Sequence, residues 1–343
     1  MRNFCIWGLI ISLIFTIGCG PARLDQKKKH FLHKGNLSFK EKMYQDAIRY
    51  YREAIQMDSG FAQAYNNLGI VYYKTGKLEK SLKSYNSCIE NDPEFIDAFF
   101  NRSNTNYELG RYHEAIKDLN RIQHTYESAE VIYFSKGLSF FGDKAYDSAK
   151  FVFEKALALD SSNVEIYLNL ASTNISLRNF STAEILSNKA LALDQRSSDA
   201  FNLLGMIAME NDNFSKAIEY FNKGLAIESN HAFILNNRGY AYLKSNDMAS
   251  ALRDINESIV INPDNPWAYR NKGIFYAMKE DLPNAERLLK QSLDMDHKLP
   301  LSYWYLGQIF LSRGEKALAC KAFRSSIESG DQEGKKAYQQ YCQ

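Results

Sequence analysis

Large and small apolar residues recur along this chain in columns with a period of 34 residues. Nine repeats of equal length begin at residue 28 and end at residue 333 without insertion or deletion. Each repeat is predicted to form two helices joined by a turn. The repeats cover residues 28–61, 62–95, 96–129, 130–163, 164–197, 198–231, 232–265, 266–299 and 300–333.

Two columns of small residues mark where the two helices of a repeat cross, because helices approach closely only where side chains are small. The first column is Gly35, Gly69, Ser103, Gly137, Ala171, Gly205, Gly239, Gly273 and Gly307. The second column, twelve residues later, is Ala47, Ser81, Ala115, Ala149, Ala183, Ala217, Ala251, Ala285 and Ala319.

Large residues mark the predicted starts of the helices, and we interpret them as packing scaffold rather than as a cofactor site. First helices are predicted to begin at Phe31, Tyr65, Phe99, Tyr133, Tyr167, Phe201, Leu235, Tyr269 and Tyr303. Second helices are predicted to begin at Tyr44, Leu78, Tyr112, Tyr146, Phe180, Phe214, Met248 and Leu282. The third repeat is the least regular, since Ile122 replaces a small residue. Either the superhelical pitch changes near residues 122–130 or the sequence has drifted without effect, and we favour drift.

The segment AYNNLGIVYYKTGKLEKSLKSYNSCIENDP, residues 64–93, resembles the tetratricopeptide repeat (TPR). The resemblance implies an all-α fold, a right-handed αα superhelix or TPR solenoid of nine helix-turn-helix repeats. Single hairpins of this size cannot bury their apolar faces, so neighbours stack into one continuous core. Residues 334–343 are expected to form a capping helix over the terminal face.

The N-terminus resembles the signal peptide of bacterial lipoproteins. Arg2 precedes an uncharged apolar run, Phe4 to Ile17, which is too short for a membrane-spanning helix. Gly18 and Cys19 match the lipobox, whereas Thr16 stands where leucine is usual. The resemblance implies that residues 1–18 are removed and that Cys19 carries a lipid. Residues 19–27 would then form a short lipidated tether, and the eight residues from Gly20 to Lys27 would reach at most about 28 Å. An ordinary signal peptide and an uncleaved anchor remain alternatives.

Two further cysteines, Cys320 and Cys342, are candidates for a disulfide if the mature chain folds in an oxidising compartment. Two reduced thiols are the alternative.

The formal net charge of +2 does not indicate a nucleic-acid-binding protein. No phosphate loop, HExxH or CxxC motif occurs, and the pair His30 and His33 lacks a matching cysteine or carboxylate. We therefore predict no enzyme activity, no cofactor and no metal.

The concave surface of the first helices is the predicted binding groove for extended peptide segments. Asparagine stands two residues before the small column in five repeats, and a similar asparagine ladder in O-linked N-acetylglucosamine transferase holds peptide backbones. An amide both donates and accepts hydrogen bonds, although asparagine is also common here throughout the family. The predicted groove residues are Asn67, Asn101, Asn169, Asn237 and Asn271, with the aromatic residues Phe233, Tyr240, Trp267 and Trp304.

These features together predict a non-catalytic, membrane-anchored interaction scaffold of the bacterial cell envelope. The lipid would place it at a membrane, and we favour the outer membrane. Its partners would be other proteins. A glycan-binding or enzyme-associated regulatory module is the competing interpretation, and a cytosolic TPR adaptor is the third, if the signal is spurious.

Overall fold

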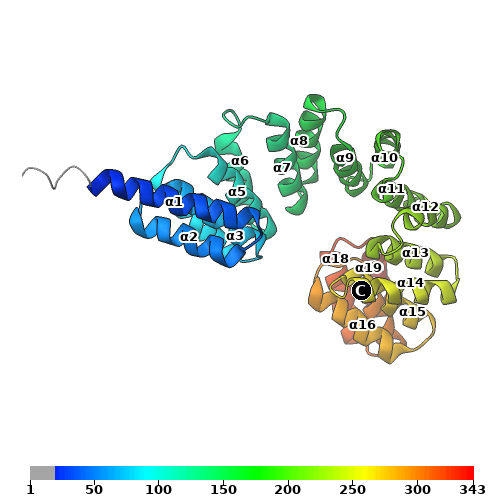
Figure 1. Ribbon diagram of the computed structural model, residues 1–343. Helices are drawn as coiled ribbons and strands as arrows, with labels where there is room; N and C mark the ends of the chain where they lie inside the picture. The colour runs from blue at the N-terminus through cyan, green and yellow to red at the C-terminus, as the bar shows by residue number, and fades with distance from the viewer. Residues whose placement is uncertain (1–19) are drawn as a thin grey trace, which may run out of the picture. The chain divides into compact units, whose positions relative to one another are not determined.

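The computed structural model describes residues 20–343, and nineteen α-helices form within that range (Figure 1). The described residues fall into two compact units, one ending at Ser161 and one comprising Ser162–Gln343. Unit 1 contains α1 (Gly20–Lys40), α2 (Tyr44–Met57), α3 (Ala62–Lys74), α4 (Leu78–Asn91), α5 (Ile96–Glu108), α6 (Tyr112–Ile122), α7 (Ala129–Gly142) and α8 (Tyr146–Leu159). Cys19 and the predicted signal peptide lie outside the described residues.

Unit 2 contains five pairs of helices in the same alternating order and ends with one extra helix. Together with the four pairs of unit 1, these helices confirm the predicted all-α solenoid. Its helices are α9 (Val164–Ser176), α10 (Phe180–Leu193), α11 (Ser198–Glu210), α12 (Phe214–Ile227), α13 (Ala232–Lys244), α14 (Met248–Ile261), α15 (Pro266–Met278), α16 (Leu282–Met295), α17 (Ser302–Ser312), α18 (Lys316–Glu328) and α19 (Gln332–Tyr341). None of the helices within residues 20–343 is long and apolar enough to cross a membrane.

The helix starts agree with the sequence prediction for the second helices and differ for the first ones. Every predicted second helix begins at its predicted residue, from Tyr44 to Leu282. The first helices α3 to α15 begin about one turn earlier than predicted; α9, for example, begins at Val164 instead of Tyr167. The helix α1 begins already at Gly20, and α17 begins one residue before Tyr303. A polar N-cap residue explains the earlier start of α9, since the side chain of Asn163 accepts a hydrogen bond from the backbone N–H of Glu165. The N-cap residues of α3 and α5 are Phe61 and Phe95, which form no such bond.

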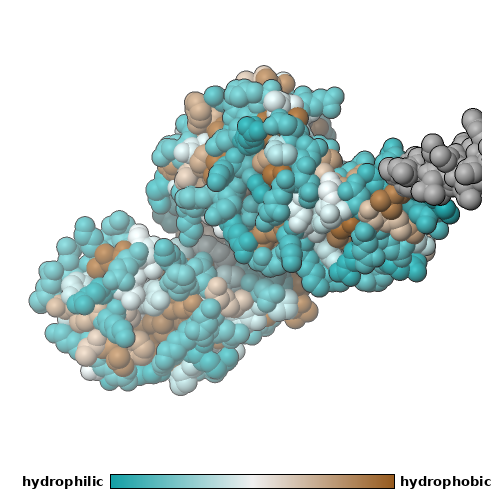
Figure 2. Space-filling view, turned by 90° about the vertical axis from the view of Figure 1, so that its left-hand side faces the viewer, coloured by the Kyte–Doolittle hydropathy of each residue, from teal (hydrophilic) through white to brown (hydrophobic). Residues whose placement is uncertain are grey.

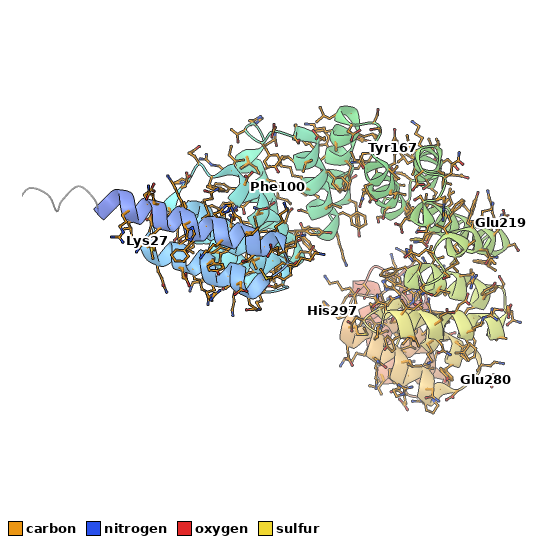
Figure 3. All side chains as sticks on the ribbon, in the orientation of Figure 1. Lys27, Phe100, Tyr167, Glu219, Glu280 and His297 are labelled. Carbon is orange, nitrogen blue, oxygen red and sulfur yellow. A yellow bond between two sulfur atoms is a disulfide. The ribbon has the colours of Figure 1, made fainter. Side chains whose placement is uncertain are left out.

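The segment predicted as a tether is helical from Gly20 onward and forms the start of α1. At about 1.5 Å per residue, residues 20–27 span roughly 12 Å, less than half the reach of an extended chain. Lys28 is held by Asp58, directly after α2, at 2.6 Å, and Lys29 pairs with Asp25 at 2.8 Å. Lys27, labelled on α1 in Figure 3, is exposed.

The small column of the first helices is explained by the residue sixteen positions later in the second helix. A Cβ at Gly205 would collide with the ring of Phe221, and one at Gly137 would collide with the ring of Phe153. Both rings are fully buried. The small residue therefore makes room for a large partner, which forms the core between the paired helices.

The turn inside each repeat contains one residue in the left-handed conformation. These residues recur every 34 positions, at Lys42, Gly76, Gly110, Lys144, Arg178, Asp212, Asn246, Glu280 and Gly314, with φ between 55° and 75°. Only three are glycine, the residue that adopts this conformation without a Cβ penalty. The turn geometry is thus a property of the repeat and not of a local glycine.

The third repeat is irregular in structure as well as in sequence. Its second helix, α6, ends at Ile122 after 11 residues, whereas α4 and α8 each have 14. Ile122 is buried among Phe99, Leu119 and Ile132. A large side chain at this position coincides with the loss of the last helical turn, while the choice between a changed pitch and sequence drift stays a prediction.

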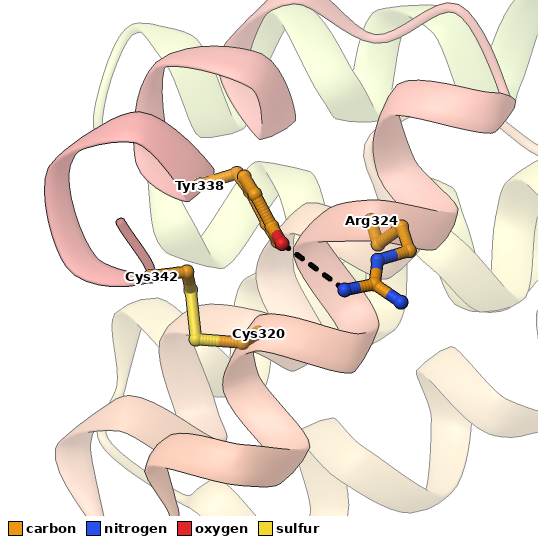
Figure 4. The surroundings of a disulfide bond; sticks show 4 residues. All are labelled: Cys320, Arg324, Tyr338 and Cys342. Atoms are coloured by element: carbon orange, nitrogen blue, oxygen red, sulfur yellow. Dashed lines mark hydrogen bonds between the residues drawn. A yellow bond between two sulfur atoms is a disulfide. The ribbon is translucent and has the colours of Figure 1, made fainter.

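The C-terminal helix α19 packs against α18 and is linked to it by a disulfide (Figure 4). Cys320 and Cys342 are bonded, with their Cα atoms 5.6 Å apart. The guanidinium of Arg324 donates a hydrogen bond to the hydroxyl of Tyr338 at 3.0 Å. Ala337 is buried against Phe323, so α19 covers the end of the core.

Candidate protein-binding surface

In unit 1 the predicted groove asparagines belong to a hydrogen-bonded chain of amides that joins three successive first helices. Asn101 donates to Asn66 at 3.1 Å, Asn66 to Asn67 at 3.3 Å, and Asn67 to Asn36 at 2.9 Å. The hydroxyl of Tyr51 also donates to Asn36. Asn67 and Asn101 are partly exposed. Each amide has two N–H groups and two acceptor lone pairs, so the exposed amides keep capacity for a ligand.

Unit 2 repeats this arrangement and ends it at a buried arginine. Asn237 donates to Asn202 at 3.0 Å, and Asn271 donates to Asn236 at 2.8 Å. Arg270 donates twice to the carboxamide oxygen of Asn271, at 2.8 and 3.0 Å. Asn271 is fully buried. The prediction that Asn271 lies on the groove surface is therefore wrong. In the interior its amide oxygen accepts from Arg270 and its amide nitrogen donates to Asn236.

The remaining predicted asparagine, Asn169, lines a small cavity between α9 and α11. Its amide donates to the backbone carbonyl of Glu165 in its own helix. The cavity measures about 230 Å³, and the carboxylates of Glu165 and Asp199 also line it. Asp199 accepts from His231 at 3.2 Å, and that hydrogen bond lowers the pKa of the carboxyl.

Exposed aromatic residues occupy the same position in two successive first helices of unit 2. Phe233 of α13 is 51% exposed and Trp267 of α15 is 39% exposed. The guanidinium of Arg270 lies 4.5 Å from the Trp267 ring and 5.3 Å from the ring of Tyr240. Burial lowers the pKa of Arg270 to about 10, which leaves it charged at neutral pH. The cation thus contacts both rings, and we call Phe233, Tyr240 and Trp267 the aromatic patch.

Trp304 packs against a different set of residues from the aromatic patch. It contacts the core formed by Ala319, Phe323 and Ala337 beneath the cap. With Met278 and Tyr305 it also lines an apolar cavity of about 260 Å³. Trp304 therefore has both a structural role and an accessible face.

Sequence reasoning missed the partners that connect the asparagines. Asn66 and Asn236 are buried and pair with Asn101 and Asn271 of the next first helix. The visible signal was the doublet Asn-Asn, which occurs at residues 66–67 and 236–237. The second asparagine of each doublet faces solvent in part, and the first one bonds the neighbouring helix.

The surface seen in Figure 2 is mostly hydrophilic, and its apolar residues form small separate patches. Within residues 20–343 no group of three or more histidine, cysteine, aspartate or glutamate side chains could hold a metal ion. The geometry therefore offers amides and aromatic rings, which bind by hydrogen bonds and apolar contact.

Comparisons with known proteins agree with this architecture. Models of the tetratricopeptide repeat match residues 62–95, 140–207 and 198–231, and a TPR repeat model matches residues 35–76. No curated protein matches the chain by sequence.

Two solved structures show the same fold at low sequence identity. One is the APC/C hetero-tetramer Cut9–Hcn1, with a TM-score of 0.62 and 16% identity over 87% of this chain. This chain spans only 59% of that one. The other is pilF of Pseudomonas aeruginosa, with a TM-score of 0.52 and 18% identity over 62% of this chain and 96% of that one. The chain therefore contains tetratricopeptide repeats, which the family models match within residues 35–95 and 140–231.

Proposed function

We propose that this protein is a non-catalytic interaction scaffold of the bacterial cell envelope, anchored by a lipid on Cys19, which binds extended segments of partner proteins. The aromatic patch is the observation that carries the binding part of the proposal. Phe233 and Trp267 are each more than a third exposed, and the Trp267 ring lies against the guanidinium of Arg270. Exposed aromatic clusters of this kind are typical of protein-binding sites.

Partly exposed amides beside the patch support an extended ligand. Asn237 follows Phe233 by one helical turn on α13 and has hydrogen-bonding capacity left after its bond to Asn202. An extended peptide presents backbone N–H and C=O groups that an amide can pair without selecting side chains. The rings would then contribute apolar contact and the amides would align the backbone.

Two observations support the location. The helix α1 begins at Gly20, directly after the residue that the lipobox resemblance identifies as the lipid site. The disulfide between Cys320 and Cys342 is of the kind that forms in oxidising compartments outside the cytosol. A lipid on Cys19 would hold α1 at the bilayer surface.

Metabolic labelling with a palmitate analogue tests the anchor. The wild-type protein should be labelled and should fractionate with membranes, and Cys19→Ser should lose both properties. Cys88→Ser is the matched control, because Cys88 is fully buried and its thiol is not accessible to lipid transfer. Equal labelling of Cys19→Ser, or recovery of the wild type in the soluble cytosol, would contradict the envelope proposal.

Affinity purification from the native cell tests the binding surface. Phe233→Ser/Trp267→Ala should lose partner proteins that the wild type retains. Trp304 is left intact because it packs beneath the cap. Val260→Ala is the control, since Val260 is 80% exposed but lies on the second helix α14. Unchanged partners in the double variant, or binding to glycans without any protein partner, would refute the proposal.

A further inference from the structure

A cation occupies the position just before the small residue in several first helices, and in two repeats it is paired with a buried aspartate. Arg102 donates to both carboxylate oxygens of Asp118 at 2.7 and 2.8 Å. Arg238 donates to both oxygens of Asp254 at 2.6 and 3.1 Å. In each pair the aspartate follows sixteen residues later in the second helix and is buried. The fold therefore builds a site for a carboxylate at this place.

The fourth repeat has the cation and lacks the carboxylate. Lys136 of α7 is 4% exposed, and the residue sixteen positions later is Val152. Its ammonium donates to the amide oxygen of Gln123. No ion pair reaches Lys136 from any residue in the described part of the chain. Lys272 of α15 holds the same repeat position but is only partly buried.

A cavity of about 440 Å³ lies beside Lys136, between α6 and α8. Its lining includes a second ammonium, Lys155, whose nitrogen lies 4.4 Å from the ring centroid of Phe151 and 5.4 Å from that of Tyr133. Asp147 also lines the cavity, but it is exposed and forms no ion pair with either lysine in the described residues. The early end of α6 at Ile122 places Gln123 at this cavity.

The electrostatic balance of the cavity favours an anion. Burial lowers the pKa of Lys136, and the neighbouring charge of Lys155 lowers it further. A buried cation is costly unless it is paired. Arg102 and Arg238 meet this requirement within the chain, whereas Lys136 has only an uncharged amide as acceptor.

We propose that this cavity binds a carboxylate side chain of a partner protein, which takes the place that Asp118 and Asp254 fill in the third and seventh repeats. The carboxylate would lie between the ammonium groups of Lys136 and Lys155. Phe151, which is 58% exposed, would cover an apolar residue next to the acid. All of these residues belong to unit 1, so the site does not depend on the aromatic patch of unit 2.

Nuclear magnetic resonance of the lysine-labelled chain from residue 20 onward provides the test. The probe is the capped tripeptide acetyl-Leu-Glu-Leu-amide, with acetyl-Leu-Gln-Leu-amide, sodium acetate and inorganic phosphate as comparison ligands. We expect the glutamate peptide to shift the Lys136 signals and to bind at least tenfold more tightly than each of the other three.

Three variants locate the effect. Val152→Asp supplies the internal carboxylate that the third and seventh repeats have. Lys136→Leu introduces leucine, the residue that the next two repeats carry at this position as Leu170 and Leu204. Both should abolish the preference for glutamate, and Lys272→Leu should leave it intact. Equal binding of the two peptides would overturn the proposal, as would full binding by Lys136→Leu. Acetate or phosphate that binds as tightly as the glutamate peptide would also overturn it.

Discussion

At Gly205 a single hydrogen atom in place of a side chain allows the ring of Phe221 to lie against the backbone of α11. In the other repeats with glycine at this position, the partner sixteen residues later is likewise a large residue, from Tyr51 to Ile255 and Leu289. Where the small residue is Ser103 or Ala171, the partner sixteen residues later shrinks to Leu119 or Ser187. The residue of the first helix therefore limits how large a side chain its partner in the second helix can have.

The pair Gly205 and Phe221 gives a direct test of this close packing. We expect Gly205→Ala to lower the free energy of unfolding by about 1–3 kcal/mol, because the added methyl group overpacks the crossing. Phe221→Leu creates room for it, so Gly205→Ala/Phe221→Leu should cost less than the sum of the two single changes. Denaturant unfolding of the four proteins measures this coupling. Strict additivity would show that the ring and the glycine do not share one space.

Lys136 makes the stability of the protein depend on pH in a predictable direction. Its pKa is lowered from 10.5 in the folded state, so between the lowered value and 10.5 the unfolded chain binds one proton more. The free energy of unfolding therefore rises with pH in this window. At neutral pH we expect Lys136→Leu to be more stable than the wild type, and the difference should shrink as the pH approaches 10.5. Denaturant midpoints measured from pH 7 to pH 10.5 would show this, and a constant difference would contradict it.

At the scale of the helix and its turns, the left-handed residue between paired helices is a point where stability can be gained. Lys144 has φ 61° and is exposed, whereas Gly76 and Gly110 hold the same place with φ 70°. A left-handed conformation costs a residue with a Cβ about 1–2 kcal/mol. We expect Lys144→Gly to raise the free energy of unfolding by roughly 0.5–1 kcal/mol. The reverse change, Gly76→Lys, should lower it, and both shifts are measurable by chemical denaturation.

The helices that the sequence could predict are those whose boundaries depend on local residues. Tyr44 and Leu282 begin their helices where the repeat pattern places them. The early end of α6 was harder to foresee, because Ile122 packs against residues of α5 and α7 that no local pattern identifies.

The candidate site shows the same division between local and tertiary information. The sequence shows that the asparagines at residues 67, 101, 169, 237 and 271 share one repeat position. It does not show which of these side chains are exposed. The burial of Asn271 depends on Arg270 beside it and on Asn236, 35 residues earlier. For Lys136, the sequence shows that Val152 stands where Asp118 and Asp254 stand in other repeats, but the burial of Lys136 and the cavity beside it depend on tertiary packing.

For the whole molecule, the stacking of neighbouring repeats predicts that a destabilising substitution affects mainly the repeats next to it. Helices within each unit contact those next to them in sequence, such as α3 with α2 and α4. In repeat proteins, stability is approximately a sum of single repeats and nearest-neighbour interfaces. A strained helix crossing in one repeat should therefore lower the stability of the adjacent repeats and leave that of distant repeats unchanged.

Hydrogen exchange in two mirrored variants tests this locality. Gly69→Ala places a methyl group against the ring of Tyr85 in unit 1, and Gly205→Ala does the same against Phe221 in unit 2. We expect the first variant to speed exchange in α1–α6 while α13–α19 keep their wild-type protection. The second variant should speed exchange in α9–α14 and spare α1–α4. If either change accelerates every helix equally, the chain unfolds as one cooperative body and the nearest-neighbour description fails, because a single strained crossing would then be felt by repeats that share no interface with it.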